Sequence, residues 1–165
     1  MSEKKKKHMT FLGVGLKLTL ISFFFTATIF TVHFLWMSHL SIPIPRIITQ
    51  VLGILLVTTG VPIYLISVKT IFKYFHEGKL ATKGTYAFFR HPLYAAWIVF
   101  IVPGIILLIN SLIGLIVPVF IYGVFKILIG EEDKYLEEKF GDEFLEYKKR
   151  VGEIFPKFQT IFRQN

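Results

Sequence analysis

The run from Leu93 to Ile129 reads LYAAWIVFIVPGIILLINSLIGLIVPVFIYGVFKILI and decides the fold, because its 37 residues are almost wholly apolar. A single helix of that length would be about 55 Å long, far more than a hydrocarbon core of about 30 Å. The run therefore predicts a helical hairpin, and Asn110-Ser111 near its middle is the expected turn.

Two further apolar runs precede the hairpin. The first extends from about Phe11 to Met37 and the second from Ile47 to Val68, and a short connection with two prolines, Ser38 to Arg46, separates them. Each run is long enough to span a bilayer, and the first is too long for the apolar core of a cleaved signal peptide. The sequence therefore predicts an all-α membrane protein with four transmembrane helices, of which the last two are antiparallel neighbours.

The composition agrees with a membrane protein. Of the 165 residues 53% are hydrophobic and 18% are charged, and the mean hydropathy is +0.59, which is too apolar for an ordinary soluble domain. The length fits one membrane-embedded domain over residues 1–165, with two helices in 1–68 and the polar loop, hairpin and tail in 69–165. The absence of cysteine excludes disulfides, thiolate metal sites and cysteine nucleophiles.

The basic residues are distributed unevenly along the chain, which carries a net charge of +8. Four lysines precede the first helix, five basic residues lie between Lys69 and Arg90, and seven follow Ile129, whereas the two opposite connections hold only Arg46. The positive-inside rule then places both termini and the middle loop in the cytoplasm, and a prokaryotic cell membrane is the expected location. Lys17, about two turns inside the first helix, is expected to snorkel, with no carboxylate partner in any helix.

The tail after Ile129 carries nine of the eleven acidic residues. The acidic residues from Glu131 to Glu138 predict a helical segment that ends at Gly141, and Asp142 is expected to cap a second one through Arg150. One apolar stripe at helical spacing runs through both segments and is expected to pack against the membrane or the other helices. It consists of Leu136, Phe140, Phe144, Tyr147 and Val151.

The hairpin is expected to bring two polar clusters together. Leu93 opens the third helix and Ile129 closes the fourth on the same side, so Arg90-His91 and Glu131-Glu132 should be neighbours in one interfacial pocket. Taken singly, each cluster has an ordinary explanation, such as a basic helix boundary or an acidic helix start. Tyr86 and Tyr94 would likewise fit an aromatic belt, and Lys148-Lys149-Arg150 a contact with anionic lipids.

The combination of these motifs is more specific than any one of them. In chain order they are LATKGTY (Leu80–Tyr86), RHPLY (Arg90–Tyr94), the pair Glu131-Glu132, and FGDEFLEYKKRV (Phe140–Val151). Together, over about the last 90 residues, they resemble the family of membrane methyltransferases that includes isoprenylcysteine carboxyl methyltransferase and phospholipid N-methyltransferases. The resemblance implies a membrane enzyme that uses S-adenosyl-L-methionine bound at the cytosolic interface.

The resemblance also implies roles for particular residues. Arg90 and Glu132 would be catalytic, and the acceptor would be lipophilic, either isoprenylcysteine carboxylate-like or phospholipid amine-like, with no nucleic acid and no metal involved. The cofactor-binding residues carried over from the family motifs are Gly78, Lys79, Leu80, Ala81, Tyr86, His91, Pro92, Leu93, Tyr94, Glu131 and Glu132.

Two positions depart from the family pattern. Ala96 stands where the family usually has glycine, and Leu128 stands where members specific for prenylcysteine carry a basic residue, so the prenylcysteine acceptor stays an open question. Lys126 is the nearest basic replacement. Two other functions remain as alternatives: a nicotinamide-dependent reductase of the related sterol reductase-like fold, and a non-enzymatic membrane module.

Overall fold

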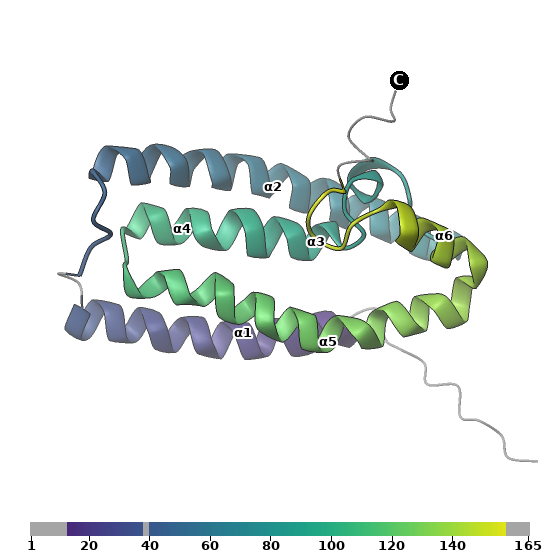
Figure 1. The fold of residues 1–165 in the computed structure, drawn as a ribbon, viewed down its shortest axis with the longest axis horizontal. Helices are drawn as coiled ribbons and strands as arrows, with labels where there is room; N and C mark the ends of the chain where they lie inside the picture. Colours follow the sequence, from purple (N-terminus) through teal and green to yellow (C-terminus); the bar gives the residue numbers. More distant parts are fainter. Residues whose placement is uncertain (1–12, 38–39, 158–165) are drawn as a thin grey trace, which may run out of the picture.

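Four long helices build the part of the chain that the structure describes, which confirms the predicted all-α membrane fold (Figure 1). The structure is a computed structural model and describes residues 13–37 and 40–157. Within these ranges it contains no β-strand. The helical stretches long and apolar enough to cross a membrane are Val14–Met37, Arg46–Glu77, Pro92–Ile109 and Ile113–Phe140.

The helical stretches are divided into shorter elements. Helices α1 and α4 adjoin π-helical turns (η1 and η3), and 3-10 turns (η2 and η4) precede α3 and α5. In chain order the elements are α1 (Gly13–Val32), η1 (His33–Met37), α2 (Arg46–Glu77), η2 (Gly84–Ala87), α3 (Pro92–Ala95), η3 (Ala96–Ile101), α4 (Val102–Ile109), η4 (Ile113–Leu115), α5 (Ile116–Phe140) and α6 (Asp142–Arg150).

The turn of the hairpin lies where the sequence predicts it. Asn110 adopts the left-handed conformation, with φ 59° and ψ 40°, which asparagine tolerates better than most residues. The N–H groups of Asn110 and Ser111 close α4 on the carbonyls of Leu107 and Ile106, at 3.1 and 3.2 Å. The predicted hairpin of two antiparallel helices is therefore confirmed.

Two helices extend further than predicted. The second helix is predicted to end at Val68, but α2 continues to Glu77 and ends at Gly78, which adopts the left-handed conformation at φ 65°. Likewise, α5 does not close at Ile129. It passes through Gly130 and the acidic residues to Phe140, so the predicted acidic helix is the end of the fourth transmembrane helix.

The helices pack in two close pairs, α2 with α4 and α1 with α5, which lie side by side in Figure 1. A side chain at Gly53 would meet the Gly104 carbonyl oxygen at 2.8 Å, so these small residues let α2 and α4 approach closely. Between α1 and α5 the rings of Phe25 and Phe120 stack at 3.7 Å. Large apolar side chains such as Ile127 point outward, 79% exposed, as expected for a surface in lipid.

The predicted apolar stripe is confirmed as a packing surface. Phe144, Tyr147 and Val151 are buried together with Leu80, and Leu136 and Phe140 of α5 pack against them. This contact folds α6 back against the end of the bundle at which α2 ends and α3 begins (Figure 1). We call this the charged end.

One sequence-based expectation is wrong, and others concern residues outside the described ranges. Gly141, and not Asp142, occupies the N-cap position of α6, so the capping role predicted for Asp142 is wrong. The four lysines that precede the first helix and Phe11, the predicted start of that helix, lie outside the described residues.

Candidate functional site

Residues 151–157, which follow α6 and which we call the C-terminal loop, hold Arg90 and His91 in place through the backbone. The Arg90 N–H donates to the Gly152 carbonyl at 2.7 Å and the His91 N–H to the Glu153 carbonyl at 2.9 Å. The Tyr147 hydroxyl of α6 donates to the Tyr86 carbonyl at 2.7 Å. The chain from Tyr86 to His91, which leads into α3, is therefore positioned by residues more than 55 places later in the sequence.

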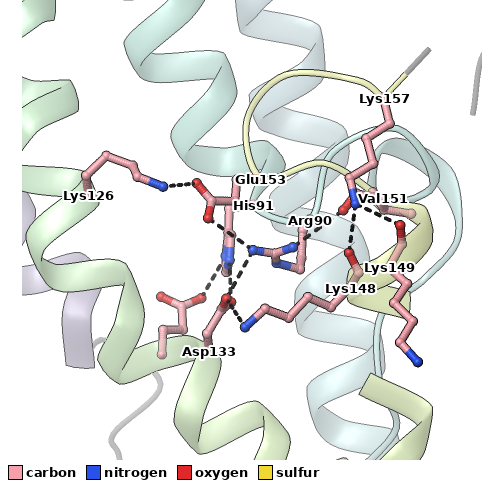
Figure 2. Close-up of polar contacts among 10 residues, drawn as sticks. Arg90, His91, Lys126, Asp133, Lys148, Lys149, Val151, Glu153 and Lys157 are labelled. Atoms are coloured by element: carbon pink, nitrogen blue, oxygen red, sulfur yellow. Dashed lines mark hydrogen bonds and ion pairs between the residues drawn. The ribbon is translucent and has the colours of Figure 1, made fainter. Parts of the chain in front are cut away.

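Arg90 is a buried residue, 5% exposed, at the centre of this region (Figure 2). Its Nη2 donates to Asp133 Oδ2 at 3.0 Å and to Glu153 Oε1 at 3.3 Å. Glu131-Glu132 are expected beside Arg90, but the carboxylates that compensate its charge are those of Asp133, the next residue of α5, and of Glu153 in the C-terminal loop.

His91 lies between two carboxylates of α5. Its Nδ1 is 3.3 Å from Glu132 Oε1 and its Nε2 is 3.0 Å from Asp133 Oδ1. A neutral imidazole has one N–H and can donate to only one of them, whereas the imidazolium donates to both. Burial by itself lowers the pKa of His91, but the hydrogen bonds and charges of Asp133 and Glu132 outweigh burial and raise it. His91 therefore favours the charged form.

Glu132 joins His91 to the tyrosines. The Tyr94 hydroxyl donates to Glu132 Oε2 at 2.9 Å. Tyr86 is buried, and this burial is the main reason why its pKa lies well above the usual range. The charge of Glu132 raises the pKa further, so the phenol stays neutral. The Glu132 side chain is 24% exposed, and each of its two carboxylate oxygens has one of these partners. His91 and Glu132 therefore contact each other, as the sequence predicts.

Glu131 faces another side of α5, because successive helical residues are about 100° apart. It pairs with Lys17 at 3.1 Å, and the two side chains are 55% and 58% exposed. Lys17 thus has a carboxylate partner, contrary to the sequence-based expectation. That expectation was wrong because it ended the fourth helix at Ile129.

Asp133 is the important residue that the sequence reasoning missed. It is 7% exposed and accepts from Arg90, His91 and Lys148, each at 3.0 Å. A signal for it existed, because a buried arginine beside a buried histidine requires a carboxylate nearby. The acidic triplet of α5 thus divides into an exposed, a partly exposed and a buried carboxylate.

The residues from Gly78 to Ala81 lie at a different place from His91. An open hollow of about 480 Å³ is lined by Gly78, Lys79 and Leu80 together with Phe140 and Glu143, among others. The N–H groups of Gly78 and Lys79 are engaged with the carbonyls of Phe75 and Tyr74 at the end of α2. The residues from His91 to Tyr94 and Glu132 do not line this hollow.

The remaining residues named from the sequence are buried, pack against the core or form an ion pair. Pro92 is fully buried at the start of α3, Ala81 and Ala96 are buried, and Leu93 is half-buried. Leu128 packs against the hydrophobic core. Lys126 instead reaches Glu153 at 2.7 Å, so it is the basic side chain of α5 that lies near Arg90.

The fold and site together define a polytopic all-α membrane protein with a buried charge network at one end of its helical bundle and a separate hollow beside the end of α2. The sequence model of the "Isoprenylcysteine carboxyl methyltransferase (ICMT) family" matches residues 42–138, more than half of the chain. The protein belongs to this family.

Several relatives support the same assignment. The chain is 39% identical over 77 residues to protein-S-isoprenylcysteine O-methyltransferase of Homo sapiens. The matched region covers 47% of this chain and 27% of the relative. It is 32% identical over 78 residues to protein-S-isoprenylcysteine O-methyltransferase B of Arabidopsis thaliana, covering 47% of this chain and 40% of that protein. The matches therefore span less than half of the length of these relatives. No solved structure matches the chain.

Proposed function

We propose that this protein is an integral membrane methyltransferase that uses S-adenosyl-L-methionine and methylates a lipophilic acceptor. The observation that carries the proposal is the contact of His91 and Tyr94 with Glu132 across the helical hairpin, in a member of this family. The relatives are named as methyltransferases, which favours methyl transfer over a nicotinamide-dependent reductase and over a non-enzymatic module.

The chemistry of the residues at the charged end fits the proposed cofactor. S-adenosyl-L-methionine carries a sulfonium, an ammonium and a carboxylate. The side chains of Glu131 and Glu132 are 55% and 24% exposed and suit the two cationic groups, and Lys17 is a nearby partner for an anion. The hollow lined by Leu80, Phe140 and polar side chains such as Glu143 offers room for the adenosyl part.

In this proposal the residues act mainly by positioning. Bound S-adenosyl-L-methionine would supply a methyl group activated by its sulfonium. Glu132 binds the cofactor, His91 and Tyr94 hold the Glu132 carboxylate by 3.3 and 2.9 Å contacts, and Arg90 orients the site through Asp133. Holding two reactants in line can supply roughly 7 to 11 kcal/mol of the barrier, so little covalent work is required of the protein.

The lipid environment explains why this site belongs in a membrane protein. We propose that the charged end faces the cytosol, so that a water-soluble cofactor enters from one side while a lipophilic acceptor approaches from the bilayer. An isoprenylcysteine-like carboxylate is the favoured acceptor, because the relatives carry that substrate in their names. The position of Lys126 beside Glu153 provides a basic group on α5 although Leu128 faces the core.

A methyl-transfer assay tests the proposal. The full chain in detergent micelles would be incubated with methyl-labelled S-adenosyl-L-methionine and, in separate reactions, with an isoprenylcysteine, a phospholipid with a primary amine, and a water-soluble thiol. The proposal is supported if the protein methylates the isoprenylcysteine faster than its Glu132→Gln variant does. The proposal is contradicted if the protein transfers no methyl group to any acceptor although a thermal unfolding transition shows that it is folded.

A further inference from the structure

A second hollow lies on the other side of Arg90, between α5 and the C-terminal loop. It has a volume of about 440 Å³, and neither Glu132 nor Tyr94 lines it. Its lining includes four basic side chains and one acidic side chain, Glu153. The basic residues are Arg90, Lys126, Lys148 and Lys157. We call this site the basic hollow.

The charges around the basic hollow are not balanced. Asp133 and Glu153 are the carboxylates that pair with its basic side chains. Four cations against two carboxylates leave an excess of two positive charges at one place. Lys157 donates only to the carbonyls of Lys148 and Lys149, at 3.2 and 2.7 Å, and so keeps its charge uncompensated within the described residues (Figure 2).

A buried donor in the same lining lacks a partner. Arg90 is 5% exposed, and its Nε has no hydrogen-bond partner among the described residues, although the two terminal nitrogens are engaged. Leaving a buried polar group unpaired costs free energy comparable to a lost hydrogen bond. An oxyanion in the hollow would compensate part of the excess charge around this unpaired donor.

The other wall of the hollow is aromatic and lies toward the apolar part of α5. Tyr122, one turn before Lys126, and Phe155 are 38% and 57% exposed, and their rings are 6.4 Å apart. Tyr122 belongs to the predicted membrane-spanning stretch, so the hollow extends from the basic residues to lipid-facing surface. A ligand that fits both walls carries an anionic group attached to an apolar chain.

We propose that the basic hollow binds the phosphate group of an anionic phospholipid, with Arg90 and Lys126 as donors and Tyr122 and Phe155 beside the glycerol and upper acyl chains. The residues assigned above to cofactor binding do not line this hollow, whereas Arg90 and Lys126 belong both to its lining and to the proposed methyl-transfer site. The proposed binding gives the protein a preference for an anionic leaflet.

Calorimetric titration of the full chain in a non-ionic detergent tests the proposal. The probes are short-chain phosphatidylglycerol, short-chain phosphatidylcholine and inorganic phosphate. Phosphatidylglycerol should bind at least about tenfold more tightly than phosphatidylcholine, whose choline cancels the phosphate charge. Inorganic phosphate should bind more weakly than either because it has no apolar part. Equal binding of the two lipids overturns the proposal, and phosphate binding as tight as that of phosphatidylglycerol overturns the assignment to a lipid.

Two variants of opposite sign sharpen the test. Lys126→Gln should weaken phosphatidylglycerol binding about tenfold, the size expected for one charge-assisted hydrogen bond. Glu153→Gln removes the acidic side chain of the lining and should tighten binding. Lys134→Gln is the matched control, because it removes an exposed lysine from α5 outside the hollow and should leave binding unchanged. Equal effects of Lys126→Gln and Lys134→Gln, or weaker binding by Glu153→Gln, contradict the proposal.

Discussion

Two ion pairs at the charged end differ above all in burial. Arg90 and Asp133 form a pair whose side chains are 4% and 9% exposed, whereas the side chains of Lys17 and Glu131 are 58% and 55% exposed. The carboxylates lie two residues apart on α5. A buried charge without a partner is expensive, while an exposed pair contributes little because water and salt screen it. The comparison therefore assigns structural importance to Asp133 and much less to Glu131.

The largest expected effect is that of Asp133→Asn. This change keeps the shape of the side chain but leaves Arg90 and His91 short of a buried negative charge, so the free energy of unfolding should fall by about 3 to 5 kcal/mol. Reversible thermal or denaturant unfolding in detergent measures it. Glu131→Gln serves as the matched control and should lose no more than about 1 kcal/mol. Similar losses in the two variants would refute the distinction between buried and exposed carboxylates.

Glu132→Gln should fall between these extremes. His91 would lose one of its two carboxylates but keep Asp133, and Tyr94 would keep a hydrogen-bond acceptor. A loss of about 1.5 to 3 kcal/mol in the free energy of unfolding is expected for a hydrogen bond to a charged group. The same unfolding assay measures it, and a loss as large as that of Asp133→Asn would contradict the intermediate position of Glu132.

The pH dependence of stability tests the charge of His91. Because the folded state raises the pKa of His91, its contribution to stability is fully present below the unfolded value of about 6.5 and is lost as the pH rises through the folded pKa. Thermal unfolding followed upward from pH 6 should therefore show a decline that is absent in His91→Gln. A decline of the same size in both proteins would locate it at another group.

Tyr94→Phe should have a smaller effect. The variant keeps the ring, which packs against Phe125 at 5.4 Å, and removes only the hydroxyl that donates to Glu132. A loss of about 1 kcal/mol in the free energy of unfolding is expected. A gain in stability would show that the burial of the hydroxyl costs more than its hydrogen bond contributes.

The smallest effect is expected from Lys17→Gln. Its partner Glu131 is exposed, so the variant should change the free energy of unfolding by less than about 1 kcal/mol, and added salt should reduce the difference further. Unfolding at low and at high salt concentration measures both. A large effect that is independent of salt would mean that lipid or detergent buries this pair.

Most of the fold could be predicted from the sequence, because the length of an apolar run limits how it crosses a bilayer. The 37 residues from Leu93 to Ile129 require a hairpin, and Asn110 tolerates the left-handed turn. The ends of α2 and α5 could not be located in the same way. Apolar composition marks the hydrocarbon core, whereas a helix continues into polar sequence until a residue such as Gly78 or Gly141 ends it.

The candidate site could be predicted in part. The contact of His91 with Glu132 follows from the hairpin, since its two helices return to the same end. The partners of Arg90 do not follow, because Glu153 belongs to a loop whose path depends on tertiary packing and Asp133 depends on the rotation of α5 beyond Ile129. Hydropathy indicates neither the path of this loop nor the rotation of α5.

Cofactor binding by calorimetry tests the central claim most directly. The full chain in detergent would be titrated with S-adenosyl-L-methionine and, separately, with NADPH. The account predicts that S-adenosyl-L-methionine binds and NADPH does not, and that Glu132→Gln weakens binding about tenfold or more. Glu138→Gln, an exposed change on the same helix, should leave binding unaltered. Folded protein that binds no S-adenosyl-L-methionine, or equal binding by the two variants, would contradict the account.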